Sequence, residues 1–157
     1  MIVNLKRLTQ LMLIACSGLL ISCIGRNAEQ NPVSVTWDRD IGVQSGMAIS
    51  DPRFAAQVVA SSGEAFKFVD IGAAVQWLNQ HEEIQKPKIW TKVLDKDTWY
   101  EVNVVFWKED VVGTPMGHGF AAYSKPVEGA INYNGVVSRI HNGETRLERN
   151  KLKQRDK

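Results

Sequence analysis

Three side chains of this sequence have the chemistry to bind a soft metal ion: Met47, Met116 and His118. Thioether sulfur and imidazole nitrogen are ligands that soft ions accept. Met116 and His118 are two positions apart in a glycine-rich loop, and an extended backbone would point both side chains the same way. Met47 is distant in the sequence, so the fold would have to bring its sulfur to the other two side chains.

The same three residues also have ordinary structural interpretations. Met47 could fill the core and Met116 could pack beneath its loop, because methionine fits irregular gaps. His118 could be exposed, or hydrogen-bonded to a carbonyl. His81 and His141 lie in polar contexts, which predicts solvent-facing side chains.

Catalytic signatures do not accompany these residues. The sequence has no phosphate-binding glycine loop followed by lysine, no Gly-x-Ser-x-Gly turn and no His-Glu-x-x-His pair. A hydrolase built from Ser45, His118 and a carboxylate stays open, but nothing in the spacing favours it. We therefore expect a protein that is not an enzyme. The carboxylates near Arg39 are predicted to form a solvated, Arg-paired cluster of Asp38, Asp40 and Asp51.

Residues 1–22 are typical of a lipoprotein signal peptide. Lys6 and Arg7 precede a largely apolar stretch, which ends in Leu20-Ile21-Ser22-Cys23 and so resembles a bacterial lipobox. We expect cleavage before Cys23 and diacylation of its thiol; a lipobox ending at Cys16, or an uncleaved anchor helix, are the alternatives. Ile24 follows the cysteine, which favours the outer membrane. The predicted location is the periplasmic face of a bacterial membrane.

Cleavage would leave the folded part nearly neutral and without a free thiol. The whole chain carries 19 basic and 17 acidic side chains, and the signal holds two of the basic ones. This balance argues against nucleic acid as a partner. Cys16 would leave with the signal and Cys23 would carry lipid, which excludes a cysteine-based zinc site and a cysteine nucleophile.

The predicted elements of the first part of the chain must position the candidate ligands. We expect a tether over 23–32 and a half-buried strand over 33–37, because Val33, Val35 and Trp37 alternate with polar residues. Two further strands, over 54–60 and 65–69, are expected to flank a hairpin turn at 61–64, although the three alanines within 54–60 leave a helix open there. Asp70 is predicted to cap a helix with an apolar stripe that ends near Glu83.

A second round of strands and a helix is predicted in the later part. We expect strands over 88–94, 99–102, 104–107 and 120–123, a short helix within 125–133 and a last strand over 136–140. The rounds 47–83 and 88–133 form a possible internal repeat. The domain would cover 33–143, and the basic run 144–157 is predicted to be a disordered, solvated tail.

Four segments in register resemble the nitrous-oxide reductase accessory lipoprotein (NosL) family. They are Gly46–Gln57, Lys67–Gly72, Val93–Trp99 and Thr114–Phe120. The resemblance implies an α+β fold of two related ββα-type halves packed as one compact domain, similar to organomercurial lyase. It also implies a monomeric, lipid-anchored periplasmic metallochaperone that binds copper(I) and helps supply it to a cuproenzyme such as nitrous-oxide reductase.

The chain departs from that family at its usual cysteines. The family's Cys-x-x-Cys-x-Met run reads Gly42-Val43-Gln44-Ser45-Gly46-Met47 here, and its later Cys-Met pair reads Ala73-Ala74. The sequence is thus identified as a divergent member without the thiols, and Met47, Met116 and His118 are the surviving copper(I) ligands. The expected partners are the membrane, through the lipid anchor, and a cuproenzyme or copper transporter. The alternative is a metal-free interaction lipoprotein that has lost its copper site.

Overall fold

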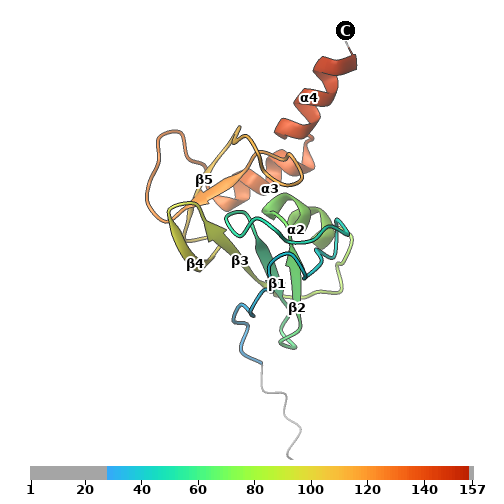
Figure 1. The fold of residues 1–157 in the computed structure, drawn as a ribbon, viewed down its shortest axis with the longest axis vertical. Helices are drawn as coiled ribbons and strands as arrows, with labels where there is room; N and C mark the ends of the chain where they lie inside the picture. The colour runs from blue at the N-terminus through green and yellow to red at the C-terminus, as the bar shows by residue number, and fades with distance from the viewer. Residues whose placement is uncertain (1–27, 156–157) are drawn as a thin grey trace, which may run out of the picture.

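The computed structural model describes residues 28–155 and shows an α+β fold (Figure 1). The predicted signal peptide 1–22 and the lipidation site Cys23 lie outside the described residues. Among the described residues, no helix is long and apolar enough to cross a membrane. The elements are β1 (Ala56–Val59), β2 (Ala65–Phe68), α2 (Ile71–Leu78), β3 (Lys88–Val93), β4 (Lys96–Glu101), β5 (Phe106–Lys108), β6 (Ala121–Tyr123), α3 (Tyr133–His141) and α4 (Arg146–Arg155).

The larger sheet has the strand order β2-β1-β3-β4, with every neighbouring pair antiparallel. β1 lies inside the sheet and all four of its residues are buried. The predicted hairpin turn joins β1 to β2, and Gly63 adopts φ +88°, a left-handed conformation that glycine reaches without a steric penalty. The predicted strands at 54–60, 65–69 and 88–94 are therefore confirmed, with somewhat shorter bounds.

α2 packs on one face of this sheet. The indole of Trp77 contacts the rings of Phe66 and Phe68, with centroid distances of 4.5 and 5.5 Å. The helix ends at Leu78, so the predicted end near Glu83 is wrong. The His81 ring stacks on Trp77 at 3.9 Å, and its Nδ1 lies 2.8 Å from the Trp77 carbonyl oxygen. The Gln80 amide also donates to the Trp77 carbonyl (2.9 Å), which closes the last turn of the helix. The contact with Trp77 leaves His81 half-buried rather than solvent-facing.

The N-terminal segment covers the opposite face. Trp90, Gln57 and Lys67 are register partners across β3, β1 and β2, so their side chains share that face. Each of these three side chains forms a hydrogen bond with the N-terminal segment. Trp90 Nε1 donates to the Gln30 carbonyl (2.8 Å), and Lys67 Nζ donates to Asp40 (2.6 Å). The Gln57 amide exchanges two hydrogen bonds with the Val33 backbone (2.8 and 2.9 Å).

These contacts change two predictions about the N-terminal segment. Residues 33–37 do not form a strand, because Val33 meets the Gln57 side chain instead of a backbone ladder. The described part of the predicted tether, residues 28–32, is held against the sheet. Gln30 Nε2 also donates to the Val59 and Lys86 carbonyls, each at 2.9 Å.

The second sheet pairs β5 with β6 and is joined to the first by the Leu94 amide, which donates to the Ala122 carbonyl at 2.9 Å.

α3 follows the second sheet and includes residues 136–140, where a strand was predicted. The helix predicted within 125–133 is not formed, except that α3 begins at Tyr133. Asn132 caps α3 by accepting the Gly135 amide (2.9 Å), and Val136 and Ile140 are buried one turn apart. This i, i+4 burial outweighs the β-branched composition that favoured a strand.

The prediction of a disordered tail is also wrong. Residues 146–155 form α4, which projects from the end of the molecule opposite to the blue N-terminal segment of the described chain (Figure 1). Thr145 is 3% exposed, and its hydroxyl accepts the Glu148 amide (3.3 Å), which is the bond of a helix cap. The many charged residues of this segment favoured a disordered tail although Thr145 can cap a helix. Beyond its first turn the helix is exposed, as a solvated basic segment would be.

The buried Gln57 amide provides a test of how the N-terminal segment is held. Replacing Gln57 by Leu removes both hydrogen bonds to Val33, and we expect the free energy of unfolding to fall by about 1–3 kcal/mol. Gln76→Leu, at a half-buried position of α2, is the matched control and should change stability less. Urea unfolding measures both, and equal effects would contradict the role of Gln57.

Candidate functional site

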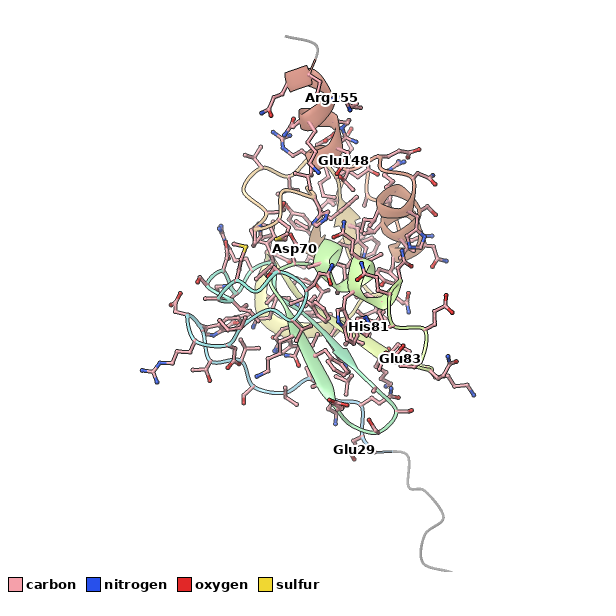
Figure 2. All side chains as sticks on the ribbon, turned by 90° about the vertical axis from the view of Figure 1, so that its right-hand side faces the viewer. Glu29, Asp70, His81, Glu83, Glu148 and Arg155 are labelled. Carbon is pink, nitrogen blue, oxygen red and sulfur yellow. The ribbon has the colours of Figure 1, made fainter. Side chains whose placement is uncertain are left out.

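The candidate site is built around the buried carboxylate of Asp70, which is 1% exposed. Its Oδ1 accepts the Ala73 amide at 2.9 Å and so caps α2, as predicted. Its Oδ2 accepts the amide of Met116 at 2.9 Å, although that residue lies in a different part of the chain. Figure 2 shows Asp70 at the end of α2 nearer to α4. One carboxylate therefore ties the glycine-rich loop to the helix.

His118 is the third partner of this carboxylate. The imidazole is 2% exposed, and its Nδ1 lies 3.3 Å from Asp70 Oδ1 and 3.5 Å from Oδ2. Among the described residues, His118 Nε2 is the only buried side-chain nitrogen or oxygen without a hydrogen-bond partner. Because leaving a buried polar atom unpaired costs about 1–3 kcal/mol, this atom calls for a ligand or another explanation.

Gly72 makes room for the imidazole. A Cβ atom on Gly72 would lie 2.3 Å from His118 Cγ and Nδ1, closer than any side chain allows. Glycine lowers the stability of a helix interior by about 1 kcal/mol relative to alanine. Here it permits the ring to lie directly against the first turn of α2. The ring is thus fixed sterically by Gly72 and electrostatically by Asp70.

The two methionines occupy different environments. Met116 is half-buried and packs against the core, whereas Met47 is 47% exposed, so Met47 does not fill the core. Met47 lines a hollow of about 240 Å³ together with Gly113 and Pro115. The fold therefore places the Met47 side chain beside the start of the loop that carries Met116 and His118.

The loop that carries Met47 is anchored to β2. The Val43 amide donates to the Lys67 carbonyl (3.0 Å), and a Cβ on Gly42 would lie 3.3 Å from Val69 Cγ1, so this loop packs directly before Asp70. Asp40 Oδ2 accepts from Lys67 Nζ (2.6 Å) and from the Thr36 amide (2.9 Å). The Lys67 hydrogen bond and then the Thr36 amide hold the pKa of Asp40 below its usual range.

Three structural interpretations can now be compared with the fold. Met116 does pack against the core, Met47 does not, and His118 is neither exposed nor bonded to a carbonyl.

Of the predicted acidic cluster, Asp40 pairs with Lys67 and Asp51 with Arg53 (2.7 Å), so the expected pairing with Arg39 is wrong. Among the described residues, no three His, Cys, Asp or Glu side chains form a group that could hold a metal ion.

Sequence reasoning missed the roles of Asp70 beyond capping and of Gly72. Asp70 stands between apolar residues, Val69 and Ile71, which indicates burial, and a buried carboxylate needs several donors. A glycine in the first turn of a helix, where no special backbone conformation is required, indicates the close approach of another group. Both signals were present in the sequence, but neither identifies His118 as the group that approaches.

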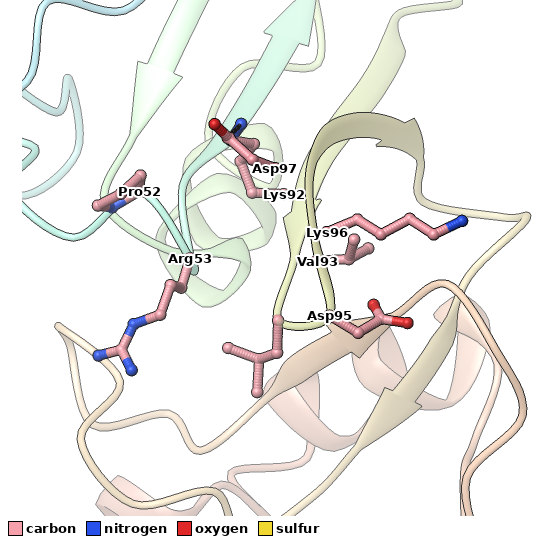
Figure 3. Close-up of a pocket in the computed structure, with 8 residues that line it drawn as sticks. Pro52, Arg53, Lys92, Val93, Asp95, Lys96 and Asp97 are labelled. Atoms are coloured by element: carbon pink, nitrogen blue, oxygen red, sulfur yellow. Dashed lines mark hydrogen bonds and ion pairs between the residues drawn. The ribbon is translucent and has the colours of Figure 1, made fainter.

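A second hollow, of about 330 Å³, lies at the turn between β3 and β4 (Figure 3). Four of its charged side chains already have partners: Arg53 binds Asp51, Lys92 binds Asp97, and Asp95 accepts from the Ser124 amide and hydroxyl. Lys96 is the remaining charged side chain of the lining, and a single lysine does not make a convergent set of ligand groups. The Asp70 region is the better candidate.

Neither a scan against protein-family models nor a search of curated proteins found a match to this chain. The likeness to the NosL family thus depends on the four sequence segments described above.

The Asp70 carboxylate should be essential for stability. We expect Asp70→Ala to lower the free energy of unfolding by about 2–6 kcal/mol, because it leaves the Ala73 and Met116 amides without their buried acceptor. Asp70→Asn keeps a capping oxygen and should lie between this variant and the wild type. Asp51→Ala, which breaks an exposed pair, should cost less than about 1 kcal/mol. Denaturant unfolding that ranks Asp51→Ala at or above Asp70→Ala would contradict this role.

The Met47 loop should loosen in acid. Because the pKa of Asp40 is lowered in the folded state, its stabilising contribution is present above the ordinary aspartate pKa of about 3.9 and is lost as the pH falls through the lowered value. Hydrogen exchange should show protection of the Thr36 amide at neutral pH that declines in acid. Asp40→Asn should reduce this protection at neutral pH and remove the acid dependence. The distant Ile131 amide, bonded to Trp107, is the control; parallel changes at both amides would indicate general unfolding instead.

Proposed function

We propose that this protein binds copper(I) and carries it to a periplasmic cuproenzyme, using His118, Met116 and Met47. The observation that carries the proposal is the unpartnered Nε2 of the buried His118 ring. Its other nitrogen faces the Asp70 carboxylate. Metal-binding histidines usually donate their second ring N–H to a carboxylate, which fixes the tautomer and makes the ligating nitrogen more basic.

The donor set suits a soft ion that must be released. With the Nδ1 proton directed to Asp70, the lone pair of Nε2 is available to copper(I), and the thioethers add soft sulfur ligands without negative charge. Such a site is weaker than a thiolate site, which favours transfer over storage. Met47 is the exposed member of the set and lines the hollow beside Pro115, so it is the residue from which an arriving ion would be passed inward.

The remaining features of the proposal concern location and ancestry. A lipid on Cys23 would tether a monomeric domain to the periplasmic face of the outer membrane, where a cuproenzyme such as nitrous-oxide reductase or a copper transporter would be the partner. The order β1-β2-α2 and, after it, strands followed by α3 supports two related ββα-type halves of the NosL kind. We regard the chain as a divergent NosL-like protein that uses thioethers where its relatives use thiols.

A second candidate function is supported by the exposed side chains of the Met47 loop. Ile41, Val43 and Met47 are 53%, 50% and 47% exposed, so three large apolar side chains lie on one loop. Exposed apolar groups that gather in one place are typical of interaction surfaces. The metal-free alternative is a lipoprotein that docks a partner through this loop. Replacing Met47 by Leu separates the two functions, since it removes the sulfur but keeps an apolar side chain.

A copper(I) titration against a competing chelator tests the proposal. The full chain should carry Cys16→Ser and Cys23→Ser, because thiols outside the site would otherwise bind the ion. We expect one ion per chain, and a loss of affinity of at least about ten-fold for Met47→Leu, Met116→Leu and Asp70→Asn. His141→Gln, at an exposed histidine, is the control and should bind as the parent does.

Two results would overturn copper carriage. One is a parent chain that fails to compete with the chelator. The other is a parent chain whose affinity is unchanged when both thioethers are replaced together. Either result would leave the metal-free docking function as the better interpretation.

A further inference from the structure

The start of α4 packs directly on the loop that carries His118. The Arg146 amide donates to the His118 carbonyl at 3.1 Å. Cβ atoms on Gly117 and Gly119 would lie 3.6 Å from Leu147 Cδ1 and 2.7 Å from Arg146 Cβ. The backbone of residues 117–119 is therefore in contact with the first turn of α4, and the loop cannot move outward unless this turn moves too.

The side chains of the same turn hold it down through Asp110. Arg149 forms an ion pair with the Asp110 carboxylate, and Arg146 Nη1 donates to the Asp110 carbonyl at 3.3 Å. These contacts are solvent-exposed, so salt weakens the ion pair. Leu147 is half-buried, and it supplies the apolar part of the contact.

The rest of α4 has little to keep it in place. None of its residues is buried, and the second apolar side chain, Leu152, is 57% exposed. A short helix that is polar on every side is marginal by itself in water. Segments held by few buried contacts open locally far more often than a packed sheet does. The element that covers the His118 loop is thus held by few buried contacts.

We propose that the first turn of α4 is a releasable latch that controls access to His118. In the closed state the imidazole is 2% exposed, so the exchange of any ligand at Nε2 requires the loop 113–119 to loosen. Release of Arg146, Leu147 and Arg149 frees this loop on its outer side while Asp70 continues to hold it on the inner side. The latch regulates the copper site of the proposed function and in that respect rests on it.

The latch can be tested without copper, by chemical modification of His118. Diethyl pyrocarbonate acylates exposed neutral imidazoles, and mass spectrometry of the full Cys16→Ser, Cys23→Ser chain would give the rate at each histidine. We expect Leu147→Ala to raise the rate at His118 by about five- to ten-fold, as loss of half a leucine's burial predicts. Leu152→Ala is the matched control and should leave it unchanged. The exposed His141 should react equally in all variants.

Salt and a covalent lock supply independent readouts. Higher ionic strength should raise the rate of His118 modification in the parent chain but have less effect in Arg149→Ala, which already lacks the ion pair with Asp110. Lys153→Ala should behave as the parent.

A Cβ on Gly117 would lie 3.9 Å from Leu147 Cβ, within the range of a disulfide. Because Gly117 adopts φ +74°, its replacement strains the loop, so the oxidised and reduced forms of the pair Gly117→Cys and Leu147→Cys are compared with each other, and oxidation should slow His118 modification.

The outcomes separate the latch from copper binding. A His118 rate that oxidation of the cysteine pair does not change, and that is the same in Leu147→Ala and Arg149→Ala as in the parent, would overturn the latch, whatever copper does. A rate that rises in these variants while the parent chain fails to bind copper(I) would support the latch and overturn the proposed function. If both hold, the latch variants should also exchange copper(I) with the chelator faster than the parent.

Discussion

The Asp70 carboxylate is the group on which the arrangement of the candidate site depends. A carboxylate removed from water costs several kcal/mol unless donors surround it. Those donors come from separate parts of the chain: the Ala73 amide from α2, the Met116 amide and the His118 ring from the loop 113–119. Satisfying one buried charge thus fixes the position of a glycine-rich loop, which has few side chains of its own with which to pack.

The position of the His118 ring follows from two constraints that both act near its Nδ1 atom. Asp70 faces Nδ1 with its carboxylate, and the missing Cβ of Gly72 lets the ring lie against the helix. What results is an imidazole in a fixed orientation, with one nitrogen that has no hydrogen-bond partner within residues 28–155. This is the usual environment of a metal-binding histidine. A buried nitrogen without a partner also costs stability, and this cost is why the proposed function assigns a ligand to it.

The two ends of the described chain complete the fold in a similar way. The N-terminal segment is held by a row of side chains, Trp90, Gln57 and Lys67, and α4 is held by its first turn on the loop 117–119. Neither joins the backbone ladder of a sheet. Side-chain contacts of this kind are easier to break locally than a buried strand. Mobility is therefore expected at the outer parts that bear on the site, and rigidity at the sheet and α2 beneath it.

The sequence by itself determined the elements whose signals are local. The hairpin at 61–64, the strand pattern at 88–94 and the Asp70 cap were all predictable, because turn residues, alternation and capping act over a few positions. It failed where distant contacts outweigh local preference: Val33 binds a glutamine side chain in place of a strand partner, Val136–Ile140 coils to bury one stripe, and residues 146–155 form a helix that docks on a loop. The residue types of the site were visible, but only the tertiary structure decided their surroundings. Burial, the pairing of His118 with Asp70 and the placement of Met47 beside Pro115 arise from segments far apart in the chain, and no local pattern encodes such meetings.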